Sequence, residues 1–190
     1  MTGRLARLLS VDLQAGRTAV VVEVPAAHGL VEHVRAEFGP DAGVRIVPHV
    51  TVLYPWLEAD EITPTDLTGL AAVAAGVPAF DVVFDRFAWF PGVLWLAPDP
   101  VDPFVRLTRG AARCWPHTPP YGGAHGDVTP HLTVMDLAAA GVDPDDEIAL
   151  KDTVERLEPW APVVDRAVAL SVLRYDGDRR CTRLASVPLG

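Results

Sequence analysis

The stretch VPHVTVLYP (residues 47–55) has the composition of a buried strand, yet it carries a histidine and a threonine two positions apart. Because side chains alternate along a strand, His49 and Thr51 lie on one face while the valines beside them pack on the other. Polar side chains in a core strand cost free energy unless they are hydrogen-bonded or face an opening. The stretch therefore predicts a strand that borders a cleft.

The same pattern returns in TPHLTVMDL (residues 129–137). Both copies read Pro-His-x-Thr-Val, and the two histidines are 82 residues apart (131 − 49), almost half the chain. One His-x-Thr alone is a weak signal, because a neighbouring hydroxyl often satisfies a buried histidine. A duplicated structural unit has no packing reason to repeat the polar pair. We therefore expect the catalytic residues to be His49, Thr51, His131 and Thr133.

Two imidazoles and two hydroxyls brought together across a cleft suit phosphoryl chemistry. The pKa of histidine lies near neutrality, so both its acid and its base form are available. One imidazole can take a proton from the nucleophile while the other gives a proton to the leaving oxygen. The hydroxyls can hold the tetrahedral anion between them.

Apolar runs and breakers along the chain predict an α+β fold. Strands are expected at residues 18–24 and 47–55, in a hairpin over 80–97, in the second motif, and in a closing hairpin of 163–177 against 179–189. Helices are expected at 26–38, 63–76, from about 103, and at 143–157, with a long loop at 114–129. The half-chain repeat favours two pseudo-twofold lobes, with two antiparallel sheets lining a central cleft and helices outside.

Composition narrows the choice of partner and compartment. The formal net charge of −9 disfavours a long nucleic-acid footprint but not a small anionic ligand. Cys114 and Cys181 form no CxxC pair, which fits a reducing compartment and gives no disulfide or zinc framework. Ser10 and Asp12 interrupt the early apolar run, so neither a signal peptide nor a membrane span is predicted. We expect a monomeric, cytoplasmic protein.

With these motifs the chain resembles the two-histidine (2H) phosphoesterases, which include bacterial 2′-5′ RNA ligase-like proteins and cyclic nucleotide phosphodiesterases. The resemblance rests on HVTV and HLTV, on their spacing, on FPGVLWLAP and PPYGG before the second motif, and on the closing SVPLG. It covers the chain from about Thr18. Residues 1–17 are then an N-terminal extension of a single domain spanning 1–190.

The resemblance implies a bilobal α+β fold and a metal-independent hydrolase without a cofactor. Its substrates would be 2′,3′-cyclic phosphates or related phosphodiesters of small nucleotide-like molecules, cleaved by the two histidines with the threonines binding phosphate. It favours His131 as the base that activates water and His49 as the acid. Met135 and Asp136 stand where RNA ligase-like members often carry a basic residue, which favours a small substrate over RNA.

Two alternatives stay open. One is ATP-independent 2′-5′ ligation at RNA 3′ ends, the reverse of opening a cyclic phosphate. The other is a nucleotide or RNA-end binding module that has the cleft but does no chemistry.

Four further residues are candidates for substrate binding. Tyr121 in the Pro/Gly-rich loop and the aromatic residues Tyr54 and Phe90 adjoin the motifs, where a base would stack on a ring at roughly 1–3 kcal/mol. Arg45, just before the first motif, would help to neutralise a phosphate.

A metal site near the second motif is the weaker interpretation of this loop. His117, His125 and Asp127 are close to His131 in sequence, but their spacing matches no common set of metal ligands. We therefore expect no metal.

Overall fold

The computed structural model describes residues 15–43, 46–123, 129–176 and 180–190. The strands are β1 (Thr18–Glu23), β2 (His49–Leu53), β3 (Phe80–Phe90), β4 (Val93–Asp99), β5 (Leu132–Asp136), β6 (Val163–Ala167), β7 (Ala169–Tyr175) and β8 (Cys181–Pro188). The α-helices are α1 (His28–Phe38), α2 (Pro64–Ala75), α3 (Asp102–Cys114) and α4 (Glu147–Leu157). Short 3-10 helices are η3 (Pro25–Ala27), η4 (Pro120–Gly123) and η5 (Glu158–Trp160). The predicted α+β class is confirmed.

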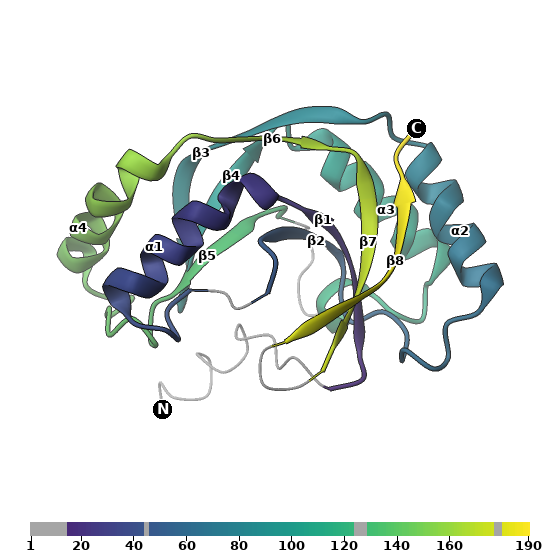
Figure 1. Cartoon of the computed structure of the whole chain (residues 1–190), viewed down its shortest axis with the longest axis horizontal. Helices are drawn as coiled ribbons and strands as arrows, with labels where there is room; N and C mark the ends of the chain where they lie inside the picture. The colour runs from purple at the N-terminus through teal and green to yellow at the C-terminus, as the bar shows by residue number, and fades with distance from the viewer. Residues whose placement is uncertain (1–14, 44–45, 124–128, 177–179) are drawn as a thin grey trace.

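The described strands form one curled antiparallel sheet of eight strands, in the order β6-β3-β4-β5-β2-β1-β7-β8 (Figure 1). The expectation of two separate sheets is corrected by this order. The two motif strands, β2 and β5, pair at Val50 and Leu132 and so join the two halves. The polar motifs therefore meet at the middle of the sheet.

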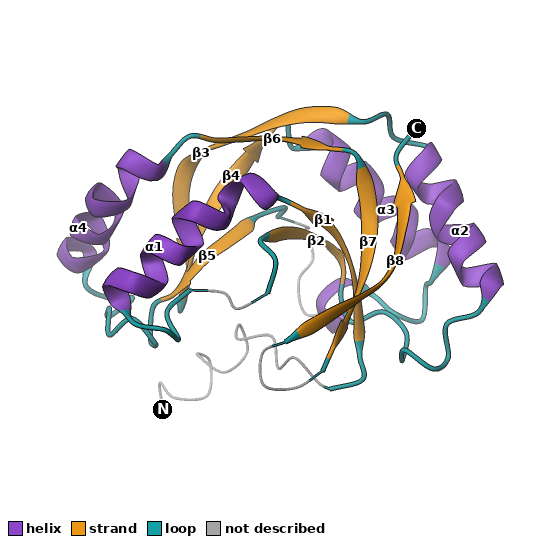
Figure 2. Cartoon of the chain, viewed as in Figure 1, coloured by secondary structure: helices purple, strands orange, loops and turns teal. Residues whose placement is uncertain are grey.

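Two helix pairs flank the strands, with α1 and α4 on one side and α2 and α3 on the other (Figure 2). Each motif strand ends a strand-helix-strand unit, β1-α1-β2 or β4-α3-β5. Helix α1 contacts β5 and helix α3 contacts β2, so each helix covers the motif strand of the other unit. Full duplication of the lobes stays a prediction.

Within the described ranges, no helix has the length and apolar character needed to cross a bilayer.

The alternation predicted for the motif strands is confirmed. The apolar residues that alternate with the motif residues are Val50, Val52, Leu132 and Val134, each at most 2% exposed. The four motif residues on the opposite face are partly exposed. Burying each valine or leucine contributes about 1.5–3 kcal/mol, and a shift of one residue would move all of them to the wrong face. Core packing thus fixes the direction of the polar side chains.

Most predicted boundaries agree with the structure, and one helix begins later than expected. Helix α2 has the predicted Thr63 cap, whose hydroxyl and the Asp66 carboxylate bond each other's backbone amides. Helix α4 was expected to begin at Asp143 but begins at Glu147. The reason is Asp146, whose carboxylate accepts hydrogen bonds from two first-turn amides and caps the helix there.

The closing segment differs from the single strand expected over residues 163–177. It divides at Val168, which is 55% exposed, into β6 and β7. Strand β6 pairs with β3 at one edge of the sheet, whereas β7 pairs with β1 and β8 in the other half. Alternation predicts strand conformation but not the partner of each part.

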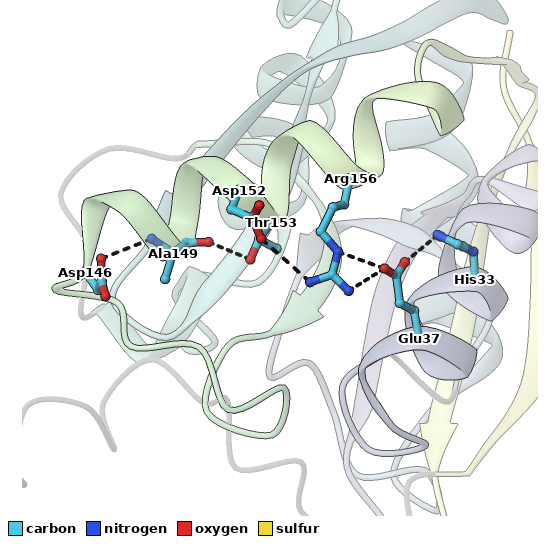
Figure 3. A network of polar contacts seen from close by, with 7 residues as sticks. All are labelled: His33, Glu37, Asp146, Ala149, Asp152, Thr153 and Arg156. Atoms are coloured by element: carbon cyan, nitrogen blue, oxygen red, sulfur yellow. Dashed lines mark hydrogen bonds and ion pairs between the residues drawn. The ribbon is translucent and has the colours of Figure 1, made fainter.

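A polar network joins α1 to α4 (Figure 3). The Glu37 carboxylate accepts from Arg156 on α4, whose Nε lies 2.8 Å away, and pairs with His33 Nε2 at 2.7 Å. The His33 ring stacks on Trp160 with centroids 4.5 Å apart. Such partly exposed pairs contribute about 0–1 kcal/mol each. The network helps to hold the two helices on the half of the sheet that contains β5.

Candidate active site

Both motif histidines are oriented by the same backbone contact. His49 Nδ1 lies 2.8 Å from the carbonyl oxygen of Val47, and His131 Nδ1 lies 2.8 Å from that of Thr129. Because a carbonyl only accepts, each Nδ1 carries the hydrogen and each Nε2 is left for chemistry. The proline between the partners restricts the preceding residue to extended conformations and so helps to aim its carbonyl. This contact explains why proline belongs to the repeated motif.

The register of β2 and β5 arranges the four motif side chains. The strands are antiparallel and pair through the residue between histidine and threonine in each motif. Continuing this register by one residue in each direction sets His49 opposite Thr133 and Thr51 opposite His131. Cβ atoms of opposite residues are about 4.5–5.5 Å apart. This register predicts that each histidine lies beside the threonine of the other motif.

The environment of the histidines disfavours a doubly protonated state. Burial lowers the pKa of His49 from its ordinary value of 6.5, although the Val47 carbonyl acts in the opposite direction. The charge of His131 lowers the pKa of His49 further. Burial also lowers the pKa of His131. Two imidazoles that repel each other when both are charged leave at most one ring protonated, which fits a pair that acts as one acid and one base.

An aromatic pair packs on the second histidine. The Phe90 ring meets the His131 ring edge-on at 5.1 Å between centroids, and Trp95 lies 5.8 Å from the same ring. Phe90 and Trp95 stack on each other at 4.9 Å. Phe90, predicted to bind substrate, is thus beside a motif histidine, while its contact with substrate stays a prediction. Trp95, which the register sets opposite Thr133, was missed; its signal in the sequence was an aromatic residue in the β-rich run VLWLAP.

The other predicted substrate-binding residues are placed differently. Tyr54 is 7% exposed and packs edge-on against Tyr175, with centroids 5.5 Å apart, in a small apolar cluster. Its ring is therefore part of the packing beside the first motif. Tyr121 belongs to η4, which contacts β2, but its side chain lies outside the described structure. Arg45 lies outside the described residues altogether.

The loop considered for metal binding is only partly described. His117 is exposed, and His125 and Asp127 lie outside the described residues. Within the part of the chain that the structure describes, no group of three or more His, Cys, Asp or Glu side chains is placed to hold a metal ion.

A partly buried ion pair beside His49 was also missed. In the register of the two strands, Glu23 on β1 is opposite His49 on β2. Its carboxylate accepts a 2.6 Å hydrogen bond from Arg183 on β8. The signal in the sequence was the single charged residue in TAVVVEV, whose neighbour across the sheet only the register reveals.

A separate cavity of about 930 Å³ lies away from the motifs. Its lining comes from β3, β4 and the end of α4, and includes Arg86, Asp99, Val154 and Glu158. It contains none of the four motif residues. A cleft shared by the two motifs therefore stays a prediction.

Comparison with known proteins places these motifs in a family. A family model described as the 2′-5′ RNA ligase superfamily matches residues 22–179, which include both His-x-Thr motifs. No curated protein matches the chain.

Solved structures show the same fold at low sequence identity. The crystal structure of Escherichia coli LigT complexed with 3′-AMP is 18% identical, covers 93% of this chain and 99% of its own, and has a TM-score of 0.61. TT0787 of Thermus thermophilus is also 18% identical, covers 91% of this chain and 97% of its own, and has a TM-score of 0.56. Other structures of E. coli LigT hold NADP+, phosphate or ATP.

Proposed function

Because the chain belongs to the 2′-5′ RNA ligase superfamily of 2H phosphoesterases, we propose that it is a metal-independent phosphodiesterase. It opens 2′,3′-cyclic phosphates or related phosphodiesters of small nucleotide-like substrates. The observation that carries the proposal is the pairing of the two motif strands. In each motif, the histidine Nδ1 donates a hydrogen bond to a backbone carbonyl oxygen. Both Nε2 atoms are then available for proton transfer.

The reaction needs two proton transfers and one anion site. His131 Nε2 takes a proton from water as the oxygen attacks phosphorus. His49 Nε2 gives a proton to the ribose oxygen as its bond to phosphorus breaks. Thr51 and Thr133 donate hydrogen bonds to the non-bridging phosphate oxygens, where negative charge accumulates in the transition state.

Two considerations favour a small nucleotide as substrate. E. coli LigT, which shares the fold, is complexed with 3′-AMP and with phosphate in separate structures. A 3′-phosphate is one product of opening a 2′,3′-cyclic phosphate, so such a ligand fits the proposed reaction. The net charge of −9 disfavours a long polyanion, which makes ligation of RNA 3′ ends the less favoured direction.

The proposal is tested with a panel of 2′,3′-cyclic nucleotides and oligonucleotides ending in a cyclic phosphate, assayed with excess chelator. We expect mononucleotides to be hydrolysed with chelator present, because the two histidines supply both proton transfers. Product analysis by chromatography identifies the oxygen that leaves. Activity that is lost with chelator and restored by a divalent ion would contradict the metal-independent mechanism, and binding without turnover would favour the non-catalytic module.

The threonines provide a second test. Thr51→Val and Thr133→Val keep the β-branched shape but remove the hydroxyl donor. We expect each variant to lose about tenfold or more in kcat/KM, the effect of one lost hydrogen bond to a charged group, with little change in melting temperature. Equal losses of stability and activity would mean that the hydroxyls are structural.

A further inference from the structure

Glu23 and His49 are neighbours on the face of the sheet that carries the motifs. Strand β1 pairs with β2 in antiparallel register, with Glu23 opposite His49 and Val22 opposite Val50. The two valines lie in the main core, so the adjacent pair points to the other face. Opposite residues have Cβ atoms about 4.5–5.5 Å apart. The carboxylate is thus held beside the first motif histidine by backbone pairing.

The carboxylate is almost enclosed and only partly satisfied. The Glu23 side chain is 12% exposed, and its Oε2 accepts from Arg183 Nη2 at 2.6 Å. Its Oε1 is buried and has no hydrogen-bond partner among the described residues. A buried, partly unsatisfied carboxylate is unfavourable for stability, so its position needs another explanation.

The charges around the two histidines are unequal. The described charged or titratable groups that face His49 are Glu23 on β1, His131 just before β5 and, through Glu23, Arg183 on β8. The side chains described against His131 are instead the aromatic rings of Phe90 and Trp95. A negative charge therefore favours the protonated form of one imidazole and not of the other.

We propose that Glu23 is a positioning residue that favours the protonated form of His49, so that His49 rather than His131 is the proton donor to the leaving oxygen. Arg183 pairs with this carboxylate and partly offsets its charge. The inference rests on the proposed function, since it assigns roles within that reaction. In agreement with it, Glu23 acts to raise the pKa of His49 and so offsets part of the lowering by burial and by His131, which keeps that pKa below its ordinary value of 6.5.

The direct test is an NMR titration of the histidine side chains in the full-length protein. Glu23→Gln keeps the shape and removes the charge, so the His49 midpoint should fall, and the His131 midpoint should not fall with it because the repulsion between the two rings is relieved. Glu32→Gln is the matched control, because it removes one carboxylate from a partly exposed pair with Arg35 on α1. It should move neither midpoint.

A second variant keeps the test decisive if Glu23→Gln does not fold. Arg183 is 57% exposed, so Arg183→Gln removes the cation with little effect on packing. The carboxylate then acts on His49 without a competing positive charge, and the His49 midpoint should rise. No shift in this variant, or a shift downward, overturns the inference.

The pH profile of kcat/KM links the titration to catalysis. The alkaline limb reports loss of the proton from the acid, so Glu23→Gln should move this limb to lower pH and leave the acidic limb in place. An unchanged alkaline limb in an active Glu23→Gln variant overturns the role of Glu23 while the proposed function stands. Shifted midpoints in a protein that cleaves no cyclic phosphate would instead contradict the proposed function and leave the electrostatic effect intact.

Discussion

Turnover of a 2′,3′-cyclic nucleotide is expected to fall by about two to four orders of magnitude in His49→Ala and, separately, in His131→Ala. Each variant removes one of the two Nε2 atoms that the Nδ1 contacts leave available. Loss of either proton transfer leaves the reaction to water, which is a poorer acid and a poorer base than a positioned imidazole. The measurement is kcat and KM under substrate saturation, with most of the loss in kcat.

The control for these variants is a histidine outside the motifs. His33 pairs with Glu37 and stacks on Trp160, so His33→Ala should lower the melting temperature and leave turnover near that of the wild type. The motif variants should show the opposite behaviour, because their side chains are partly exposed and lie on the face away from the main core. Near-normal turnover in either motif variant would contradict the two-histidine mechanism.

The sequence was sufficient to predict the motif face, for a physical reason. A strand with one buried face leaves no freedom in the direction of its side chains, so the alternation around His49 and His131 fixes where both rings point. Repetition at half the chain length then indicated that the two strands act together. The structure adds that the strands are direct neighbours in one sheet, through pairing at a single position in each motif.

The rest of the site depends on contacts that periodicity does not encode. Glu23 and Trp95 are residues of ordinary strands, and only the register sets one opposite His49 and the other opposite Thr133. Tyr54 shows the converse case, because an aromatic residue close to a motif fits either a ligand contact or an apolar cluster. Its low exposure assigns it to packing. Strand order and burial are long-range properties, so local sequence alone does not determine them.

The division of labour between the histidines gives the second large effect. The acid is needed only when the leaving oxygen must be protonated, whereas the base is needed for any substrate attacked by water. A p-nitrophenyl phosphodiester has a leaving group that departs as a stable anion. On this substrate His49→Ala should recover most of its two to four orders of magnitude, and His131→Ala should not.

Three features of the site lead to this direction of rescue. His49 lies opposite a carboxylate that favours its charged form, while His131 lies against two aromatic rings that do not. Mutual repulsion disfavours charging both rings, and Glu23 acts to favour the charge on His49. The activity of the wild type should accordingly show a bell-shaped dependence on pH with the cyclic substrate. With the p-nitrophenyl phosphodiester, the decrease of activity at alkaline pH should be smaller. Rescue confined to His131→Ala would exchange the two roles, and rescue of neither variant would mean that the histidines do not act as a separate acid and base.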